Sequence, residues 1–396
     1  MEAVEDIVIA GAGLAGLATA LGKGVRCLVL ESSPALRASG FAFTTWTNAF
    51  RALDALGVGD KIREHHLLYK RMTAFSAATG EAAATVSLKM QGKRPHELRC
   101  VKRDFLLQTL ENELPKGTIR YSSKIVAIEE DGNLTALHLA DGSTMKTKVL
   151  IGCDGVNSVV AKWLGLPKAI LSGRSATRGL AEYPADHGFG PEILQFIGQG
   201  FRSGVLPCND TSVYWNYTWY PCPADGDAEE SVAKMRSYVL DKLRGARIPV
   251  AALDVIERSE MSDVVSSPLR FRSPLALVRG TISRGGVCVA GDALHPMTPE
   301  LGQGGCSALE DGVVLARCLG EAFAAGGGDE AATAAALGKY AEARRWRSVQ
   351  LVTAAYVVGF IQQSNNVVVK FLRDTFLSPL LAKTLVAMAD YDCGTL

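Results

Sequence analysis

A glycine-rich segment near the start of the chain has the residue types and spacing of a phosphate-binding turn. The segment Gly11-Ala12-Gly13-Leu14-Ala15-Gly16 follows the short apolar run 6–10, which predicts a buried strand, and precedes an Ala- and Leu-rich stretch that predicts a helix. Gly11 allows a tight turn, Gly13 lets the backbone approach a pyrophosphate, and Gly16 lets the helix pack closely on the strand. The free N–H groups at the start of such a helix favour a bound phosphate.

A carboxylate lies where a nucleotide-binding fold requires one. Residues 25–30 predict a second strand, and this strand ends in Glu31. A carboxylate at this place can accept hydrogen bonds from the ribose hydroxyls of an adenosine. The alternative is a glycine-rich turn without a ligand, but the order of strand, turn, helix and acidic residue favours a dinucleotide site.

A second glycine-rich segment, far along the chain, extends the prediction from adenosine to a flavin. Asp292 follows the predicted strand 286–290 and can accept hydrogen bonds from a polyol chain such as ribityl. After Pro299, the residues Gly302-Gln303-Gly304 begin a long predicted helix, whose first N–H groups could face the pyrimidine edge of an isoalloxazine ring. A helix capped by a glycine loop is the alternative for this segment alone. The two segments in this order predict FAD as the cofactor.

These motifs resemble those of the class A FAD-dependent aromatic hydroxylases, the single-component monooxygenases with the fold of para-hydroxybenzoate hydroxylase. Asp154-Gly155, after the predicted strand 149–151, is similar to the family's middle motif, which serves both FAD and the pyridine nucleotide. Arg37 and Arg103 occupy positions where the family places flavin-contacting arginines. The runs 43–48 and 303–306 look most like the plant branch, described as salicylate-hydroxylase-like or zeaxanthin-epoxidase-like.

The resemblance implies an α/β fold with a discontinuous Rossmann-like FAD-binding domain, a β-sheet substrate domain and C-terminal helices. The expected segments are 1–72, 99–165 and 275–340 for the FAD-binding domain, 73–98 and 166–274 for the substrate domain, and 341–396 for the C-terminal helical segment. The expected cofactor-binding residues are Gly11, Gly13, Leu14, Ala15, Gly16, Glu31, Arg37, Arg103, Asp154, Gly155, Asp292, Pro299, Gly302, Gln303 and Gly304.

The resemblance also implies a reaction. NADPH or NADH would reduce the FAD, O₂ would add to give a flavin C4a-hydroperoxide, and one oxygen atom would pass to a small aromatic substrate, phenolic or related. Epoxidation of an isoprenoid double bond and a catalytically inactive flavin-binding scaffold are the alternatives. No catalytic base is assigned from the sequence.

One position departs from the family pattern. The family commonly carries Arg three residues after the Ser of the middle motif, whereas Ser158 is followed at that spacing by Ala161. Lys162 is the nearest substitute for a contact to the nucleotide.

Residues 212–220 predict a strand with two different faces. Because side chains alternate along a strand, Trp215 and Tyr217 share one face and Tyr214, Asn216 and Thr218 the other. An aromatic face suits a cover over an apolar cleft, so Trp215 and Tyr217 are expected to contact the substrate, together with Pro296 beside the glycine loop. Ordinary core packing explains the aromatic face almost as well.

Composition fits an enzyme that acts on small molecules. The chain has 396 residues, which favours two domains with a shared cleft. Lys and Arg number 42 against 41 Asp and Glu, so the net charge of +1 gives no electrostatic case for a nucleic-acid partner. The cluster at 344–347 is expected to be a solvated helix face. The expected partners are therefore a small aromatic molecule and O₂.

The remaining patterns concern compartment, metals and assembly. Nine cysteines lack C-x-x-C spacing and six histidines lack metal-ligand spacing, so we expect buried thiols in a reducing compartment and no metal site. The acidic start 1–6 is unlike a signal or transit peptide, and no apolar run approaches the ~20 residues of a membrane span, so a cytoplasmic enzyme is expected. The apolar C-terminal helices are expected to pack across a domain boundary; a homodimer or a membrane-surface contact is the alternative.

Overall fold

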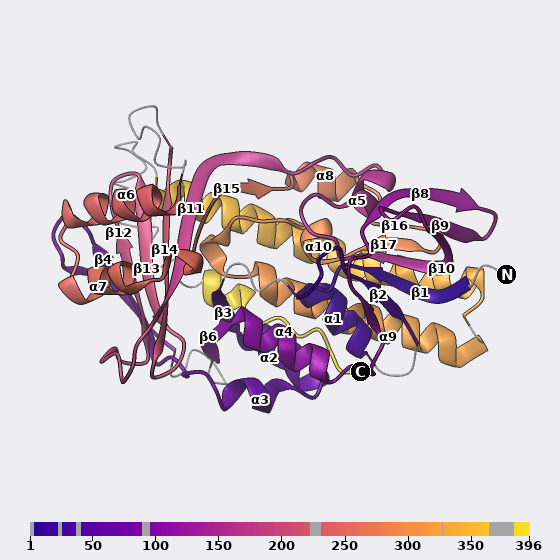
Figure 1. Ribbon diagram of the computed structural model, residues 1–396, viewed down its shortest axis with the longest axis horizontal. Helices are drawn as coiled ribbons and strands as arrows, with labels where there is room; N and C mark the ends of the chain where they lie inside the picture. The colour runs from indigo at the N-terminus through magenta and orange to yellow at the C-terminus, as the bar shows by residue number, and fades with distance from the viewer. Residues whose placement is uncertain are drawn as a thin grey trace.

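Two large β-sheets lie at opposite ends of the protein and are joined by long helices, and β3 and β6 form a separate two-stranded sheet (Figure 1). The computed structural model describes residues 4–22, 26–36, 41–88, 96–221, 231–326, 328–363 and 384–396. This mixed α/β architecture confirms the predicted fold class. None of the helices in the described ranges is long and apolar enough to cross a membrane.

The first sheet brings the glycine-rich motifs together. Its main path runs in the order β16-β17-β10-β1-β2-β7, and β8 and β9 extend it through β10. The pairs β2/β1, β1/β10 and β10/β17 are parallel, so the carboxyl ends of these four strands lie at one edge. The strands are β1 (Val4–Ala10), β2 (Leu28–Leu30), β7 (Ile119–Arg120), β8 (Ile125–Asp131), β9 (Leu134–Leu139), β10 (Thr144–Gly152), β16 (Ser283–Arg284) and β17 (Val287–Val289).

Helices bury this sheet. The ends of β1 and β10 consist of buried apolar residues, as expected for parallel strands covered on both faces. α1 packs against α9 so closely that a Cβ at Gly312 would overlap Ala18. The neighbouring elements are α1 (Leu14–Leu21), β3 (Ala42–Trp46), α2 (Thr47–Ala55), α3 (Gly59–Arg63), β6 (Leu98–Lys102), α4 (Arg103–Asn112), α5 (Val159–Trp163), α8 (Pro274–Arg279) and α9 (Gly304–Gly326).

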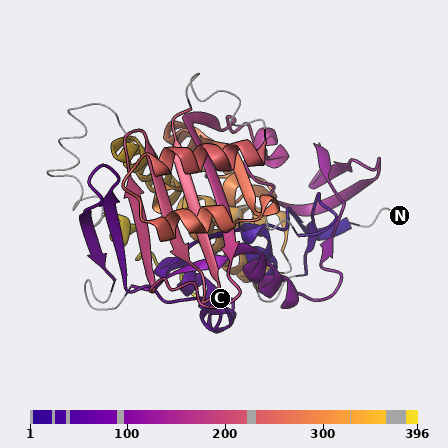
Figure 2. The same ribbon diagram turned by 60° about the vertical axis from the view of Figure 1, so that its left-hand side comes forward.

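The second sheet has seven strands in the order β15-β11-β14-β13-β12-β4-β5. Two helices, α6 (Val232–Arg244) and α7 (Val250–Arg258), lie across one of its faces (Figure 2). A separate hydrophobic core fills the space between that face and the two helices. The strands are β4 (Arg71–Ser76), β5 (Ala82–Ser87), β11 (Ile170–Glu182), β12 (Glu192–Ile197), β13 (Phe201–Pro207), β14 (Ser212–Trp219) and β15 (Val264–Phe271).

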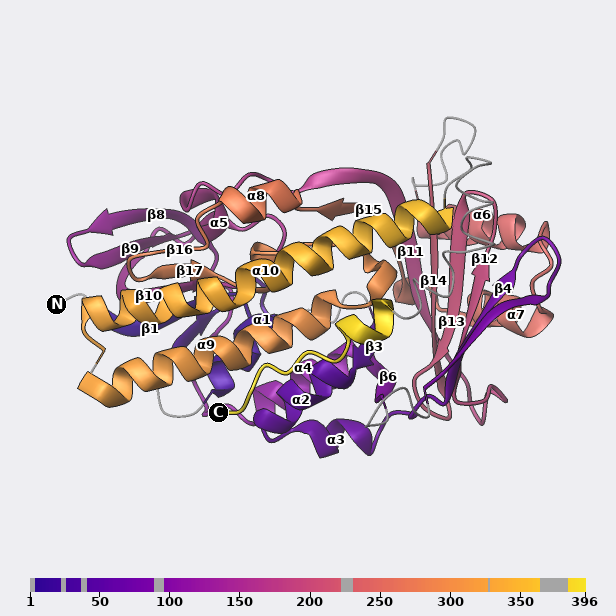
Figure 3. The ribbon, with the colours of Figure 1, turned by 180° about the vertical axis from the view of Figure 1, so that it is seen from behind.

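One long helix, α10 (Glu330–Gln363), connects the two ends of the molecule and lies alongside α9 (Figure 3). It runs without a break through the boundary that we expected between residues 340 and 341. The helix contains no proline, and its glycines, Gly338 and Gly359, do not interrupt the helical backbone. The expected boundary therefore falls inside α10, and the division of the chain into domains stays a prediction.

Buried charges join α9 to α10. Arg344 donates from Nε to Asp311 Oδ1 at 2.5 Å, and its Nη2 lies 2.7 Å from Glu310 Oε2. Arg347 Nη2 donates to Glu310 Oε1 at 2.8 Å. All four side chains are at most 7% exposed. The interpretation of 344–347 as a solvated helix face is thus wrong for both of these arginines, because each pairs with a carboxylate of α9.

This cluster of Glu310, Asp311, Arg344 and Arg347 is termed the charged seam. Burial alone would raise the pKa of Asp311, but His295 and Arg344 outweigh burial and hold that pKa at about 2. The pKa of Glu310 is likewise lowered, because Arg344 and Arg347 outweigh its burial. Both carboxylates are therefore charged at neutral pH.

The charged seam predicts a loss of stability in acid. A depressed pKa in the folded state stabilises the protein above the ordinary pKa of 3.8, and this contribution disappears as the pH falls towards about 2. Asp311→Asn should lower the free energy of unfolding at pH 7 by about 3–5 kcal/mol, because it leaves buried Arg344 without a full partner. It should also make that free energy less dependent on pH below 4. Urea titrations across this pH range measure both effects. The exposed control Asp60→Asn should change stability by less than about 0.5 kcal/mol; a similar loss in both variants would contradict the account.

Candidate functional site

The three glycine-containing motifs, separated by up to about 280 residues, meet at the carboxyl edge of the first sheet. Gly11 has φ of +101°, and a Cβ there would lie 2.5 Å from the carbonyl oxygen of Cys153. A Cβ at Gly291 would lie 2.9 Å from the Cβ of Ala15. Any larger residue at Gly11 or Gly291 would push the turns apart, so the sequence uses glycine where the motifs touch.

The first turn leaves room for a phosphate. Gly13 precedes α1 without a side-chain cap, and a Cβ built on it meets nothing within 4 Å. Glu31, at the end of β2, accepts hydrogen bonds from the backbone N–H groups of Ala12 at 2.9 Å and Ser33 at 2.8 Å. The carboxylate is therefore fixed beside the open start of α1. This arrangement fits the pyrophosphate and ribose of a dinucleotide.

The charged seam holds the motif that follows β17 through Asp311. Asp311 Oδ2 accepts the backbone N–H of Gly291 at 2.7 Å and lies 2.7 Å from Nε2 of His295. Asp292, between them in the chain, is exposed. Its carboxylate can therefore meet the hydroxyl groups of a ligand, while its neighbours are held in the core.

The middle motif uses its acidic side chain internally. Asp154 Oδ2 accepts the backbone N–H of Val159, the first residue of α5, at 2.7 Å, while Ser158 is the N-cap of this helix. Its Oδ1 is buried without a partner in the described part of the chain, and burial raises the pKa of this carboxyl. Gly155 has φ of +79°, as a turn glycine. Ala161 is buried, so an arginine there would have to displace core atoms, whereas Lys162 is exposed.

Arg103, one of the two arginines predicted to contact the flavin, lies at the start of a helix. Arg103 is the first residue of α4, and its backbone N–H donates to the carbonyl oxygen of Phe41 at 2.7 Å. Arg37 lies outside the described residues.

Residues 299–304, here termed the glycine loop, join β17 and its motif to α9. Gly302 has φ of +63°, and a Cβ there would overlap Oγ1 of Thr44 in β3. The side chain of Gln303 is buried and its Oε1 accepts a hydrogen bond from Asn48 Nδ2 at 2.8 Å. The first N–H groups of α9, from Gly304 onward, have no helical acceptor and can serve an anionic ligand.

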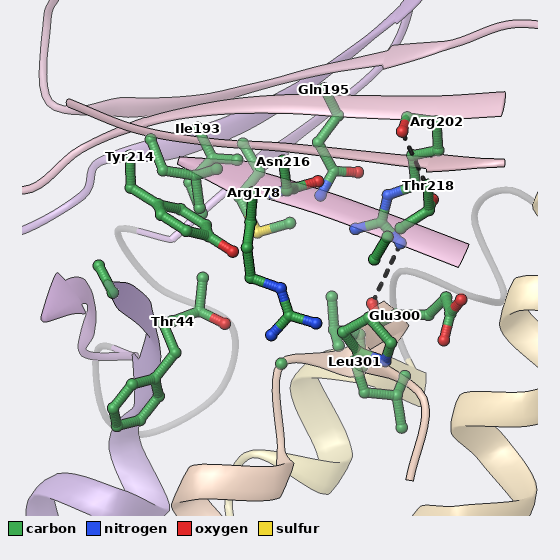
Figure 4. Close-up of a pocket in the computed structure, with 18 of the residues that line it drawn as sticks. Thr44, Arg178, Ile193, Gln195, Arg202, Tyr214, Asn216, Thr218, Glu300 and Leu301 are labelled. Atoms are coloured by element: carbon green, nitrogen blue, oxygen red, sulfur yellow. Dashed lines mark hydrogen bonds between the residues drawn. The ribbon is translucent and has the colours of Figure 1, made fainter. Parts of the chain in front are cut away.

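A cavity of about 140 Å³ lies between the glycine loop and the second sheet (Figure 4). β3 contributes Thr44, and the sheet contributes a polar set of side chains that includes Arg178, Gln195 and Asn216. The complete lining is Ala42, Phe43, Thr44, Trp46, Met72, Ala176, Arg178, Ile193, Gln195, Arg202, Leu206, Tyr214, Asn216, Thr218, Pro299, Glu300, Leu301, Gly302 and Leu385.

Positive charge dominates the cavity. The side chain of Arg178 points into it, and its guanidinium has no hydrogen bond or ion pair with any other described residue. Arg202 donates from Nη1 to the backbone oxygen of Glu300 at 3.3 Å, and burial lowers its pKa. Burial also raises the pKa of Tyr214 to about 12, although Arg178 opposes this shift. The Tyr214 hydroxyl is therefore protonated at neutral pH and can donate a hydrogen bond.

The structure corrects the predicted substrate contacts. Trp215 and Tyr217 are buried on the opposite face of β14, in the core beneath α6 and α7. The indole N–H of Trp215 donates to Ser259 Oγ at 2.7 Å, and the Tyr217 ring stacks on Trp219. The predicted alternation of side chains is confirmed. Burial of large aromatic side chains in the core stabilises the fold most, so the aromatic face packs there and the polar face lines the cavity. Pro296 is also buried outside the cavity lining, whereas Pro299 is part of it.

Several cavity residues were missed by sequence reasoning. The alternation of β14 also indicates a polar face with Asn216 and Thr218, but the aromatic face was expected to contact the substrate. Arg178 and Arg174 lie four residues apart in β11, among mostly small or apolar residues, and charged side chains within such a strand are a signal of a polar site. Among the described residues, no group of three or more His, Cys, Asp or Glu side chains is arranged to hold a metal ion.

Comparison with known proteins identifies the family. A family model described as an FAD binding domain matches residues 5–355. The chain is 46% identical to Monooxygenase 2 of Arabidopsis thaliana over 409 residues, which cover 100% of this chain and 99% of the relative. It is 36% identical to Monooxygenase 1 of the same plant, covering 98% of this chain and 99% of the relative. These relatives confirm the predicted plant-like branch.

A solved structure shares the fold. Klebsiella pneumoniae HpxO in complex with FAD and uric acid superimposes with a TM-score of 0.81 at 24% identity, covering 97% of each chain. The fold, the family model and the relatives agree with the three motifs at the sheet edge. The chain therefore belongs to the FAD-binding monooxygenases, as a member of the class A flavin hydroxylases.

Proposed function

We propose that this monooxygenase uses NADPH or NADH and O₂ to insert one oxygen atom into a small aromatic substrate that carries an anionic group. The unpartnered guanidinium of Arg178, which points into the cavity beside the glycine loop, carries this proposal. When bound, FAD supplies hydride acceptance from the nicotinamide and activation of O₂. The protein supplies the site, the orientation of the substrate and the exclusion of water.

The residues at the sheet edge fit FAD in chain order. The turn at Gly11–Gly16 would face the pyrophosphate, Glu31 the adenosine ribose, and Asp292 the ribityl chain. The glycine loop would face the flavin ring, because it is the part of this edge that also borders the cavity. Arg103 and the Asp154-Gly155 turn complete the proposed cofactor site. Exposed Lys162 is the proposed cation for the transiently bound nicotinamide nucleotide.

The balance of charges supports an anionic substrate. Arg174, Arg178 and Arg202 lie in or directly behind the cavity wall, and Glu300 is the carboxylate that faces them. This leaves an excess of positive charge in a largely buried place, where an anionic ligand would relieve it. The same polar lining is unfavourable for an isoprenoid double bond, since such a ligand would leave these groups without partners. Uric acid, present in the HpxO structure, is itself a small planar ring compound.

Different side chains would contact different parts of such a substrate. Arg178 would bind its anionic group, and Tyr214 would donate a hydrogen bond from its protonated hydroxyl. With its pKa raised to about 12 by burial, Tyr214 is a poor base at neutral pH. Apolar neighbours such as Ile193 and Leu206 would contact the ring and keep water out.

Oxidation of NADPH and NADH by the FAD-loaded protein tests the function. A suitable panel consists of salicylate, 4-hydroxybenzoate, indole-3-carboxylate, neutral aromatic control compounds without a carboxylate, and an isoprenoid alkene. The products are identified by mass spectrometry. Stimulation by an aromatic acid together with an oxygenated product supports the proposal. Stimulation only by the alkene supports epoxidation, and bound FAD that neither nucleotide reduces supports a scaffold.

The cofactor assignments predict weaker FAD binding in two variants. Asp292→Ala and Glu31→Ala each remove an acceptor for cofactor hydroxyls, a loss of ~1–3 kcal/mol, or roughly ten- to a hundredfold in affinity. Fluorescence titration of the FAD-free protein measures the dissociation constant. Asp241→Ala, on the exposed face of α6, is the matched control and should bind FAD as the wild type does. Wild-type affinity in both test variants would remove these two residues from the site.

The role of Arg178 is tested with pairs of ligands that differ only in charge. For the best aromatic acid of the panel, Arg178→Gln should raise KM roughly ten- to a hundredfold, because a charge-assisted hydrogen bond is worth ~1.5–3 kcal/mol. The corresponding amide should be affected far less. Arg178→Lys keeps the charge but not the planar donor pair, so its KM for the acid should lie between those of the wild type and Arg178→Gln. An equal loss for acid and amide would show that Arg178 does not bind the anionic group.

A further inference from the structure

Four elements meet at the wall of the cavity, where Arg202 and Glu300 are part of the lining. β11 contributes Arg174, β13 contributes Arg202, the glycine loop contributes Glu300, and the end of α10 contributes Gly359 and Gln362. Arg174 Nη1 pairs with Glu300 Oε1, and both side chains are 1% exposed. The pair is therefore enclosed by protein and fixes the glycine loop against the second sheet.

α10 passes over this ion pair at Gly359. A Cβ built on Gly359 would overlap Nη1 of Arg174 and would lie 2.7 Å from Cδ of Glu300. The residue lies inside a regular helix, where alanine is conformationally preferred to glycine. Glycine is thus required at this position by the contact and not by the backbone.

The end of α10 also holds two residues of the cavity wall. Gln362 Oε1 accepts a hydrogen bond from Arg202 Nη1 at 2.9 Å, and the same nitrogen donates to the Glu300 backbone oxygen at 3.3 Å. Gln363 Nε2 donates to Thr218 Oγ1 at 2.6 Å. The side chains of Arg202 and Thr218 lie along the sheet side of the cavity (Figure 4). The helix therefore contacts the loop and the sheet at the same place.

We infer that Arg174 and Gly359 are positioning residues that set the glycine loop and Arg202 at the cavity wall. Arg174 acts through the carboxylate of Glu300. Gly359 acts by letting α10 approach closely enough to confine that pair and to place Gln362 on Arg202. The inference rests on the proposed function only in treating the cavity as the substrate site; the position of the loop is a property of the protein without substrate.

The test uses the FAD-loaded full chain and two glycines of the same helix. Gly359→Ala inserts a methyl group into the ion pair, whereas Gly338→Ala is a matched control, because a Cβ at Gly338 meets nothing within 4 Å. Arg174→Gln removes the charge from the other side of the contact, and Arg174→Lys restores a cation. Hydrogen–deuterium exchange of peptides covering 296–306 reports on the loop, and visible circular dichroism of the bound flavin reports on the flavin environment.

Gly359→Ala and Arg174→Gln should each speed exchange in the 296–306 peptides by about tenfold, as expected for loss of a buried polar contact, and should alter the flavin signal. Peptides from β1 should exchange as in the wild type, Gly338→Ala should match the wild type throughout, and Arg174→Lys should recover part of the effect. The inference is overturned if Gly359→Ala behaves like Gly338→Ala, or if exchange rises equally in β1. If Gly359→Ala does not fold, Arg174→Gln decides alone by the same comparison of peptides. Neither readout needs a substrate, so a failure of the proposed function in the turnover assays would not change the outcome of this test.

Discussion

The charged seam between α9 and α10 is the interaction on which the rest of the structure depends. Two carboxylates and two guanidinium groups are buried there in mutual contact. Buried charges are costly unless each finds its partner, so the pairing fixes how the two helices lie against each other. Asp311 also holds the backbone N–H of Gly291 and the ring of His295, and Asn48 joins Glu310 to Gln303. The seam therefore positions the motif after β17 and the side chain of Gln303 in the glycine loop.

α10 connects the charged seam to the other end of the molecule. α10 has 34 residues, so at 1.5 Å per residue it is about 50 Å long. Its middle lies at the seam and its end lies against Arg174 and Arg202 in the second sheet. The cavity is thus bounded by two parts of the fold that are both tied to one helix. This arrangement gives a physical reason for a rigid wall opposite the glycine loop.

Local patterns predicted the parts of the site that depend on local backbone geometry. The turns at Gly11 and Gly291 were recognisable because glycine, strand and helix follow one another within a few residues. The alternation of β14 was also local and was predicted correctly. Which of its faces meets the cavity depends on α6 and α7, which come later in the chain, and the aromatic residues Trp215 and Tyr217 were assigned to the wrong side for that reason.

Long-range pairing was not accessible from the sequence. Arg344 and Arg347 look like surface residues until Glu310 and Asp311 are placed opposite them. Gly359 looks like a tolerated helix glycine until Arg174 is found beneath it. In each case the partner lies more than 30 residues away, so no periodicity within one element reveals the contact.

We propose that this chain transfers one atom of molecular oxygen to an aromatic acid. Turnover of the best aromatic acid under ¹⁸O₂ in ordinary water, followed by mass spectrometry of the product, tests it most directly. The account predicts one ¹⁸O atom in each product molecule, with the other oxygen atom released as water. A product that carries oxygen from the solvent, or consumption of NADPH that yields hydrogen peroxide and no oxygenated product with every compound of the panel, would contradict it.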